Sequence, residues 1–166
     1  MTALYTDYLN MKALPNMWCP GCGNGIIVRS VAESLAQLDL SPHKVVITTG
    51  IGCFGKADDY FATHTFHGSH GRALAFATGI KAGNPDLHVI ALMGDGDAVT
   101  IGGNHFIHTA RRNMNITAII ANNLNYGMTG GQYSATSPLE SLTSTAPKGV
   151  PEQAFDVTAL AQTAGA

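Results

Sequence analysis

Three short apolar segments, separated by helical patterns, constrain the fold of this chain more than any other feature of its sequence. They span residues 44–49, 87–93 and 116–121, and each is almost continuously apolar and contains Val or Ile. Strands covered on both faces have this composition, because none of their positions faces water. We therefore predict three buried parallel strands.

Helical patterns precede each of these strands. Apolar residues from Ile27 to Leu38 recur at helical spacing, and residues 71–81 are rich in small side chains. Residues 98–112 predict a crossover helix, despite glycines at 102 and 103 near its start. Helices alternating with strands indicate an α/β fold with a doubly wound, mostly parallel sheet, which binds ligands beyond the carboxyl ends of its strands.

The length of 166 residues suits one domain, which we assign to residues 1–166. Residues 126–151 are rich in Gly, Ser, Thr and Pro and predict a long loop over the same edge of the sheet; a loop of this length is usually functional or disordered. The sequence ends inside another helical pattern that starts near Asp156, so we expect a fragment truncated at its C-terminus.

Charged residues make up 12% of the chain, against about a quarter in typical proteins. Either partner subunits cover much of the surface, or the chain is a compact glycine-rich monomer.

A net charge of −2 gives no electrostatic sign of binding to nucleic acid or to an anionic membrane. No apolar run reaches the ~20 residues of a membrane helix, and the first residues do not form a signal peptide. We expect a cytoplasmic protein with reduced cysteines.

Acidic and amide side chains follow two of the predicted strands. Asp95, between two glycines, comes directly after the second strand, and Asn123 directly after the third. Because one crossover helix and one strand separate them, both side chains should emerge at the same edge of the sheet. Their oxygens suit Mg²⁺, whose coordination is completed by phosphate oxygens. The glycines would admit a diphosphate, and the start of the helix at residue 98 would add a positive dipole end.

This spacing resembles the thiamine diphosphate motif, in which GDG is followed, one helix and one strand later, by NN. The resemblance implies that Asp95 and Asn123 are side-chain ligands of Mg²⁺ and that the Asn125 carbonyl is a third. An ordinary strand-end turn is the alternative. A dinucleotide site fits less well, because the third glycine of GxGxxG and its later acidic residue are missing. The motif also implies cofactor contacts from Gly94, Gly96, Asp97, Gly127 and Met128.

The three cysteines form a CxxC pair, Cys19 and Cys22, and a single residue, Cys53, just after the first predicted strand. Their placement near the proposed cofactor edge suggests a metal centre. Zinc completed by a histidine and an iron–sulfur cluster fit about equally well, although a Cys₄ cluster would need a fourth ligand. A redox pair and inert buried thiols are further alternatives.

Five segments occur in one order: CPGCG, GIGCFG, HGRALAFATGIK, GDGDAVTIGGNHFIHTARRN and NYGMTGGQYS. Together, from about residue 15 to the end, they resemble the β subunit of 2-oxoacid:ferredoxin oxidoreductases, most of all the 2-oxoglutarate members. The resemblance implies a thiamine-diphosphate-binding fold. It also implies that Cys19, Cys22 and Cys53 bind one [4Fe–4S] cluster, whose fourth cysteine belongs to a C-terminal stretch absent from this sequence.

The resemblance also implies that His70 faces thiamine diphosphate and takes part in catalysis, with His67 a weaker candidate. His64, His67 and His70 lie at a spacing of three, but neighbouring glycines exclude a metal triad on a helix. Arg72 could pair with a carboxylate or phosphate of the ligand or with a structural partner. Further contacts to the cofactor are implied for Ile51, Gly52, Cys53 and Phe54.

The implied reaction is the reversible, coenzyme A-dependent oxidative decarboxylation of 2-oxoglutarate to succinyl-CoA and CO₂, with electrons passing through the cluster to ferredoxin. The general-base glutamate is expected from an α subunit in an α–β heterodimer or a dimer of heterodimers, since Glu33, Glu140 and Glu152 lie in unsuitable contexts. Alternatives are pyruvate or a branched-chain 2-oxoacid as substrate, a non-redox thiamine-dependent decarboxylase, and a zinc-stabilised binding module.

Overall fold

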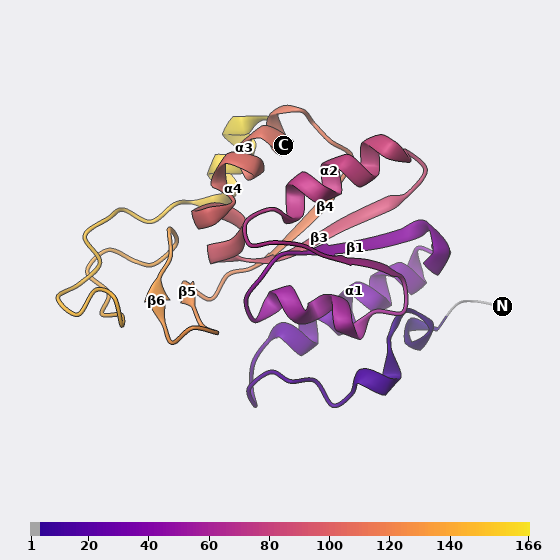
Figure 1. Cartoon of the computed structure of the whole chain (residues 1–166), viewed down its shortest axis with the longest axis horizontal. Helices are drawn as coiled ribbons and strands as arrows, with labels where there is room; N and C mark the ends of the chain where they lie inside the picture. Colours follow the sequence, from indigo (N-terminus) through magenta and orange to yellow (C-terminus); the bar gives the residue numbers. More distant parts are fainter. Residues whose placement is uncertain (1–3) are drawn as a thin grey trace.

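Four parallel strands form the central sheet in the order β2–β1–β3–β4 (Figure 1). The computed structural model describes residues 4–166, so the first three residues of the predicted domain lie outside the described part. The three predicted strands correspond to β1 (Val45–Thr49), β3 (His88–Gly94) and β4 (Thr117–Ala121). The prediction of an α/β fold with a parallel sheet is confirmed.

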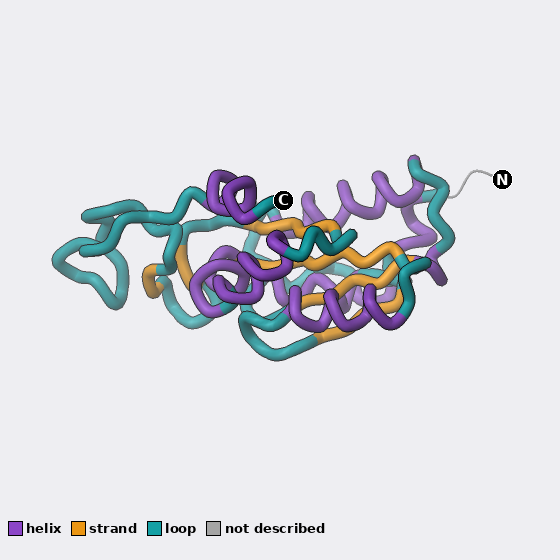
Figure 2. Tube along the Cα trace, turned by 90° about the horizontal axis from the view of Figure 1, so that it is seen from above, coloured by secondary structure: helices purple, strands orange, loops and turns teal. Residues whose placement is uncertain are grey.

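Helices cover both faces of this sheet, and Figure 2 shows strands between helical layers. α1 (Asn24–Gln37) covers one face, while α2 (Ala73–Gly83) and α3 (Gly103–Arg111) cover the other. α4 (Val157–Ala164) packs against α3, and Asp156 caps its first turn by accepting a hydrogen bond from the Ala159 N–H at 2.9 Å. The remaining elements are 3₁₀ segments Tyr5–Tyr8, Met11–Ala13, Pro42–Lys44 and Phe54–Tyr60, the edge strand β2 (His64–His67), and an antiparallel hairpin of β5 (Asn125–Tyr126) and β6 (Gln132–Tyr133).

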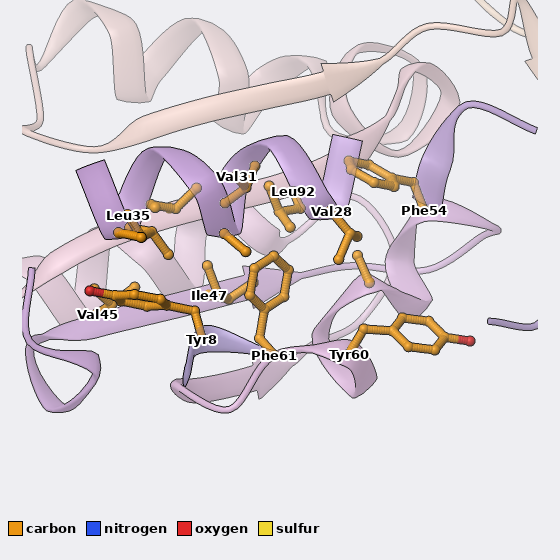
Figure 3. Close-up of a cluster of buried hydrophobic side chains, with 14 residues drawn as sticks. Tyr8, Val28, Val31, Leu35, Val45, Ile47, Phe54, Tyr60, Phe61 and Leu92 are labelled. Carbon is orange, nitrogen blue, oxygen red and sulfur yellow. The ribbon is translucent and has the colours of Figure 1, made fainter. Parts of the chain in front are cut away.

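Two hydrophobic clusters hold the layers together, one on each face of the sheet. In the first, shown in Figure 3, side chains of α1 such as Val31 and Leu35 pack on Ile47 of β1 and Leu92 of β3. In the second, residues of α2 and α3 pack on Val89 and its alternate neighbours along β3. Because successive side chains of β3 enter opposite clusters, this strand and the residues that follow it are fixed from both sides.

The prediction of one continuous helix over residues 98–112 is wrong. A π-helical turn runs from Gly96 to Ile101, the chain bends at Gly102, and α3 begins at Gly103. A Cβ at Gly102 would collide with the carbonyl oxygens of Asp97 and Ala98, so this approach of two backbone segments requires glycine. Helical structure therefore starts directly after Asp95, earlier than the positive dipole end predicted at residue 98.

The predicted long loop over residues 126–151 contains regular structure of its own, because β5 and β6 pair near its start. In Figure 1 this segment extends beyond the sheet on the side where the strands end. No helix within residues 4–166 is long and apolar enough to cross a bilayer.

Candidate functional site

A cavity of about 580 Å³ lies beyond the carboxyl ends of β1, β3 and β4. It is lined by the residues that follow these three strands, by the cysteine loop and by the start of α1. Gly96, the weaker candidate His67, and Arg72 do not line it. The predicted residues that do are Cys19, Cys22, Ile51, Gly52, Cys53, Phe54, His70, Gly94, Asp95, Asp97, Asn123, Asn125, Gly127 and Met128.

Gly96 lies directly beneath the ring of Tyr126. A Cβ at this position would overlap the ring, and the Tyr126 hydroxyl donates to the Gly96 carbonyl at 3.4 Å. Burial raises the pKa of Tyr126, so its hydroxyl stays protonated over the neutral range. The absence of a side chain at Gly96 therefore leaves room for Tyr126, a cavity-lining residue that sequence reasoning did not single out.

Asp95 places one carboxylate oxygen beside two asparagines, as the strand-end geometry predicts. One terminal atom of the Asn123 amide lies 2.8 Å from Asp95 Oδ1 and 2.8 Å from the Asn125 carbonyl oxygen. If that atom is nitrogen, both contacts are hydrogen bonds; if it is oxygen, three oxygens converge. Converging oxygens are the ligands that a hard cation requires, so these residues fit Mg²⁺.

The other carboxylate oxygen of Asp95 faces two hydroxyl groups of the segment after β6. Ser134 Oγ and Thr136 Oγ1 donate to Asp95 Oδ2 at 2.5 and 2.7 Å. Sequence reasoning missed both residues, although the hydroxyl-rich run from 134 to 137, in a loop predicted to cover this edge, was a signal that could have found them.

The side chain of Asp97 holds together the loops that follow β1 and precede α2. Its Oδ1 accepts from the Gly71 N–H at 2.6 Å and the Ile51 N–H at 3.3 Å, and lies 2.6 Å from His70 Nδ1. Within residues 4–166, Oδ2 has no hydrogen-bond partner. It lies against Gly50, where a Cβ would collide with the carboxylate. The motif implied contact with the cofactor at Asp97, but did not predict this structural role for its side chain.

Asp97 also determines how His70 faces the cavity. Because a carboxylate accepts hydrogen bonds, the contact places a hydrogen on Nδ1 and leaves Nε2 for a ligand. The Tyr126 ring meets the imidazole edge-on, with centroids 6.0 Å apart, and restricts its rotation. His67 is directed elsewhere, since its Nδ1 lies 3.1 Å from Asp58 Oδ1 and 3.2 Å from Thr49 Oγ1.

The cysteines approach the cavity from two segments. Cys19 and Cys22 are exposed, and Cys53 is half-buried. Trp18 joins the segments, because its indole N–H donates to the Cys53 carbonyl at 2.6 Å. Burial, with added contributions from Cys22 and Cys19, raises the pKa of the Cys53 thiol. In the described part of the chain, no three His, Cys, Asp or Glu side chains are already arranged to hold a metal ion.

None of the three glutamates lines this cavity within residues 4–166. Glu33 forms an exposed ion pair with Arg29 at 2.7 Å on α1. The two acidic side chains that do line the cavity, Asp95 and Asp97, are engaged as described above.

Comparison with known proteins identifies the domain. Residues 34–166 match the family model of the thiamine pyrophosphate enzymes, C-terminal TPP-binding domain, thiamine pyrophosphate being another name for thiamine diphosphate. The chain is 51% identical over 166 residues to the 2-oxoglutarate synthase subunit KorB of Archaeoglobus fulgidus, covering 100% of this chain and 62% of that protein. It is 46% identical over 140 residues to the 2-oxoacid:ferredoxin oxidoreductase subunit beta of Saccharolobus solfataricus, covering 83% and 46%.

A solved structure agrees with these relatives. The 2-oxoglutarate:ferredoxin oxidoreductase from Magnetococcus marinus, with 2-oxoglutarate, coenzyme A and succinyl-CoA bound, superposes with a TM-score of 0.95 at 39% identity, over 99% of this chain and 56% of that chain. The present chain thus spans less than two thirds of the length of these relatives. It belongs to the thiamine pyrophosphate enzymes, as their C-terminal TPP-binding domain, and within them it is similar to the β subunits of 2-oxoacid:ferredoxin oxidoreductases.

Proposed function

We propose that this chain is the thiamine-diphosphate-binding part of a 2-oxoglutarate:ferredoxin oxidoreductase β subunit. The full enzyme would convert 2-oxoglutarate and coenzyme A reversibly to succinyl-CoA and CO₂, and would pass the electrons through a [4Fe–4S] cluster to ferredoxin. The observation that carries the proposal is one cavity that brings Asp95, Asn123 and Asn125 together with three cysteines.

The residues after β3 and β4 would bind the cofactor. Asp95, Asn123 and the Asn125 carbonyl would hold Mg²⁺, which links the diphosphate to the protein. Backbone at Gly94, Gly127 and their neighbours would lie against the cofactor. Thiamine diphosphate, when bound, supplies the carbanion chemistry that 2-oxoacid decarboxylation requires.

His70 would orient or deprotonate a group of the ligand through Nε2, while Asp97 holds its other nitrogen. Cys19, Cys22 and Cys53 would provide three thiolates to the cluster, at the rim of the same cavity. Such proximity would keep the path for electrons short. A cytoplasmic location agrees with this role, because thiols remain reduced there.

A partner subunit would complete the site. The glutamate that activates thiamine is expected from an α subunit, since this chain places no glutamate at the cavity within residues 4–166. Apolar side chains at the cavity and beside it, those of Ile51, Leu124 and Met128, are between 38% and 47% exposed and would be covered by the partner.

The full-length protein, purified anaerobically with its natural partner, tests this function. Its visible spectrum should show a broad brown absorbance that bleaches when 2-oxoglutarate and coenzyme A are added. Bleaching with pyruvate or a branched-chain 2-oxoacid instead would change the substrate. A clusterless thiamine enzyme would be a non-redox decarboxylase, and a colourless zinc protein without thiamine diphosphate would be a binding module.

Two variants separate the two halves of the site. Asp95→Ala should lose bound thiamine diphosphate and Mg²⁺ but keep the brown absorbance, because it removes a proposed Mg²⁺ ligand and no thiol. Cys22→Ser should lose the brown absorbance and keep the cofactor. Loss of both groups in both variants would contradict separate roles for the aspartate and the cysteines.

A further inference from the structure

The carboxylate of Asp95 is held from the side opposite the proposed cation. Asp95, Ser134 and Thr136 are 1%, 2% and 3% exposed, so the hydrogen bonds among them are shielded from water. Buried hydroxyl groups require partners, and a carboxylate is the strongest acceptor available to them. Thr136 has a single hydrogen to donate, and Asp95 Oδ2 at 2.7 Å lies nearer than its other possible acceptors, Asn122 Oδ1 and Ser134 Oγ, both at 3.0 Å.

The two oxygens of Asp95 therefore have separate tasks. Oδ2 accepts from Ser134 and Thr136, whereas Oδ1 faces Asn123 and the Asn125 carbonyl. With Oδ2 engaged, the plane of the carboxylate is fixed and Oδ1 is presented to the cation. Groups that orient a metal ligand in this way typically contribute 10- to 100-fold to metal affinity.

The two hydroxyl groups lie on a segment that also makes other contacts with the sheet. The Ser137 hydroxyl accepts from the Ser134 N–H at 2.8 Å and donates to the Leu124 carbonyl at 2.5 Å. The Ala135 N–H donates to Thr100 Oγ1 at 2.9 Å. Residues 134–137, which we call the hydroxyl segment, therefore dock as a unit onto the turns that follow β3 and β4.

We propose that Ser134 and Thr136 are positioning residues for the Mg²⁺ of the cofactor, and that docking of the hydroxyl segment and binding of Mg²⁺ strengthen each other. The proposal rests on the function proposed above. The mutual strengthening follows from thermodynamic linkage. If the docked segment raises the affinity of Asp95 for the cation, then the bound cation must stabilise the docked segment by the same factor.

Titration of Mg²⁺ in the presence of thiamine diphosphate, by calorimetry on the full-length protein with its partner, tests the first half. Thr136→Val removes the hydroxyl and keeps the shape, and should weaken Mg²⁺ about 10- to 100-fold. Ser134→Ala should act in the same direction. Thr136→Ser restores the hydroxyl and should bind Mg²⁺ nearly as tightly as the unaltered protein.

Ser141→Ala is the matched control, because the Ser141 hydroxyl donates to the Pro138 carbonyl and does not contact Asp95. It should leave the Mg²⁺ affinity unchanged. Thermal unfolding without Mg²⁺ checks that each variant is folded. If Thr136→Val does not fold, the Mg²⁺ titration of Ser134→Ala decides the outcome.

Trypsin tests the second half, since Lys148 is the only Lys or Arg after Arg112 in this sequence. Mg²⁺ with thiamine diphosphate should slow cleavage after Lys148 in the unaltered protein, and should slow it much less in Thr136→Val. Lys148→Ala lacks this cleavage site, so the fragment that is missing from its digest is the one produced by cleavage after Lys148.

The outcomes separate this inference from the function on which it rests. If the unaltered protein binds neither Mg²⁺ nor thiamine diphosphate, the proposed function fails and this inference fails with it. If it binds both, and Thr136→Val and Ser134→Ala bind Mg²⁺ with unchanged affinity, the inference is overturned and the function stands.

Discussion

Asp95 and Asp97 lie two positions apart on the same turn, yet their carboxylates do different work. Asp95 faces the asparagines that follow β4, and Asp97 faces the loops that follow β1 and precede α2. The π-helical turn that starts at Gly96 directs the two side chains in these different directions. One short turn therefore connects the proposed cation site to the histidine.

Replacement of Asp97 should separate hydrogen-bond geometry from charge. Asp97→Ala leaves the Gly71 N–H without an acceptor and frees His70, so we expect kcat/KM to fall by the order of 100-fold, as small misplacements of reacting groups do. Asp97→Asn keeps an oxygen at the Oδ1 position and should lose far less. Steady-state kinetics measure both variants, and equal losses would show that the charge matters rather than the geometry.

The cysteines should differ in reactivity when no cluster is bound. Cys53 is half-buried with a raised thiol pKa, so at a given pH a smaller share of it is the reactive thiolate. Iodoacetamide at about pH 8 should therefore modify Cys19 and Cys22 before Cys53, and the Cys53 rate should climb as pH increases. Peptide mass spectrometry gives the order, and fastest labelling at Cys53 would contradict this assignment.

At the scale of single residues, sequence predicts strand-end positions better than partners across the fold. Asp95 and Asn123 could be placed because each follows an apolar strand at a fixed edge of the sheet. Ser134 and Thr136 lie far along the chain in a polar loop, where no periodicity tells which hydroxyl turns inward. The contact of Asp97 with His70 depends likewise on the π-helical turn Gly96–Ile101, whereas sequence reasoning predicted an ordinary helix that begins only at residue 98.

At the scale of elements, buried strands were predictable and the edge strand was not. β1 is buried at every position and begins with the apolar run Val45–Ile47, followed by two threonines. β2 is exposed at every position and is polar except for Phe66, so its sequence, HTFH, lacks both the apolar run and the alternation that indicate strands. Pairing with β1 makes it a strand, and such tertiary contacts cannot be read locally.

Two glycines in helical regions should respond oppositely to alanine. Gly79 lies inside α2 with open space at its Cβ position, so Gly79→Ala should stabilise the fold by about 0.5–1 kcal/mol. Gly102→Ala would force the Cβ against two carbonyl oxygens and should destabilise by about 1–3 kcal/mol or more. Urea unfolding compares them, and a neutral Gly102→Ala would show that the bend before α3 does not need glycine.

At the scale of the whole molecule, the cavity depends on segments that rest on both hydrophobic clusters. The cysteine loop and the residues after β1 lie beside the cluster under α1, while the turn after β3 packs into the cluster under α2 and α3. A ligand in the cavity therefore contacts both halves of the fold, and opening of either half would release it.

Cofactor binding should accordingly stabilise the domain as a unit. Mg²⁺ and thiamine diphosphate at about 100 times their Kd should add about 2.7 kcal/mol to the free energy of unfolding and raise Tm by several degrees. Asp95→Ala should abolish the shift in Tm. Differential scanning fluorimetry with an external dye measures it, and an equal shift in Asp95→Ala would place the cofactor elsewhere.

The position of Trp18 makes it an intrinsic fluorescence probe of the cysteine loop. The chain has one tryptophan, and its indole donates to the Cys53 carbonyl while its ring packs on Tyr60 with centroids 4.8 Å apart. Tryptophan emission from this chain therefore originates beside the cysteines, and a shift of this emission toward red would mark release of their loop. An iron centre at the cysteines would quench this emission by energy transfer. The decrease in fluorescence intensity during reconstitution would therefore report the extent of cluster insertion.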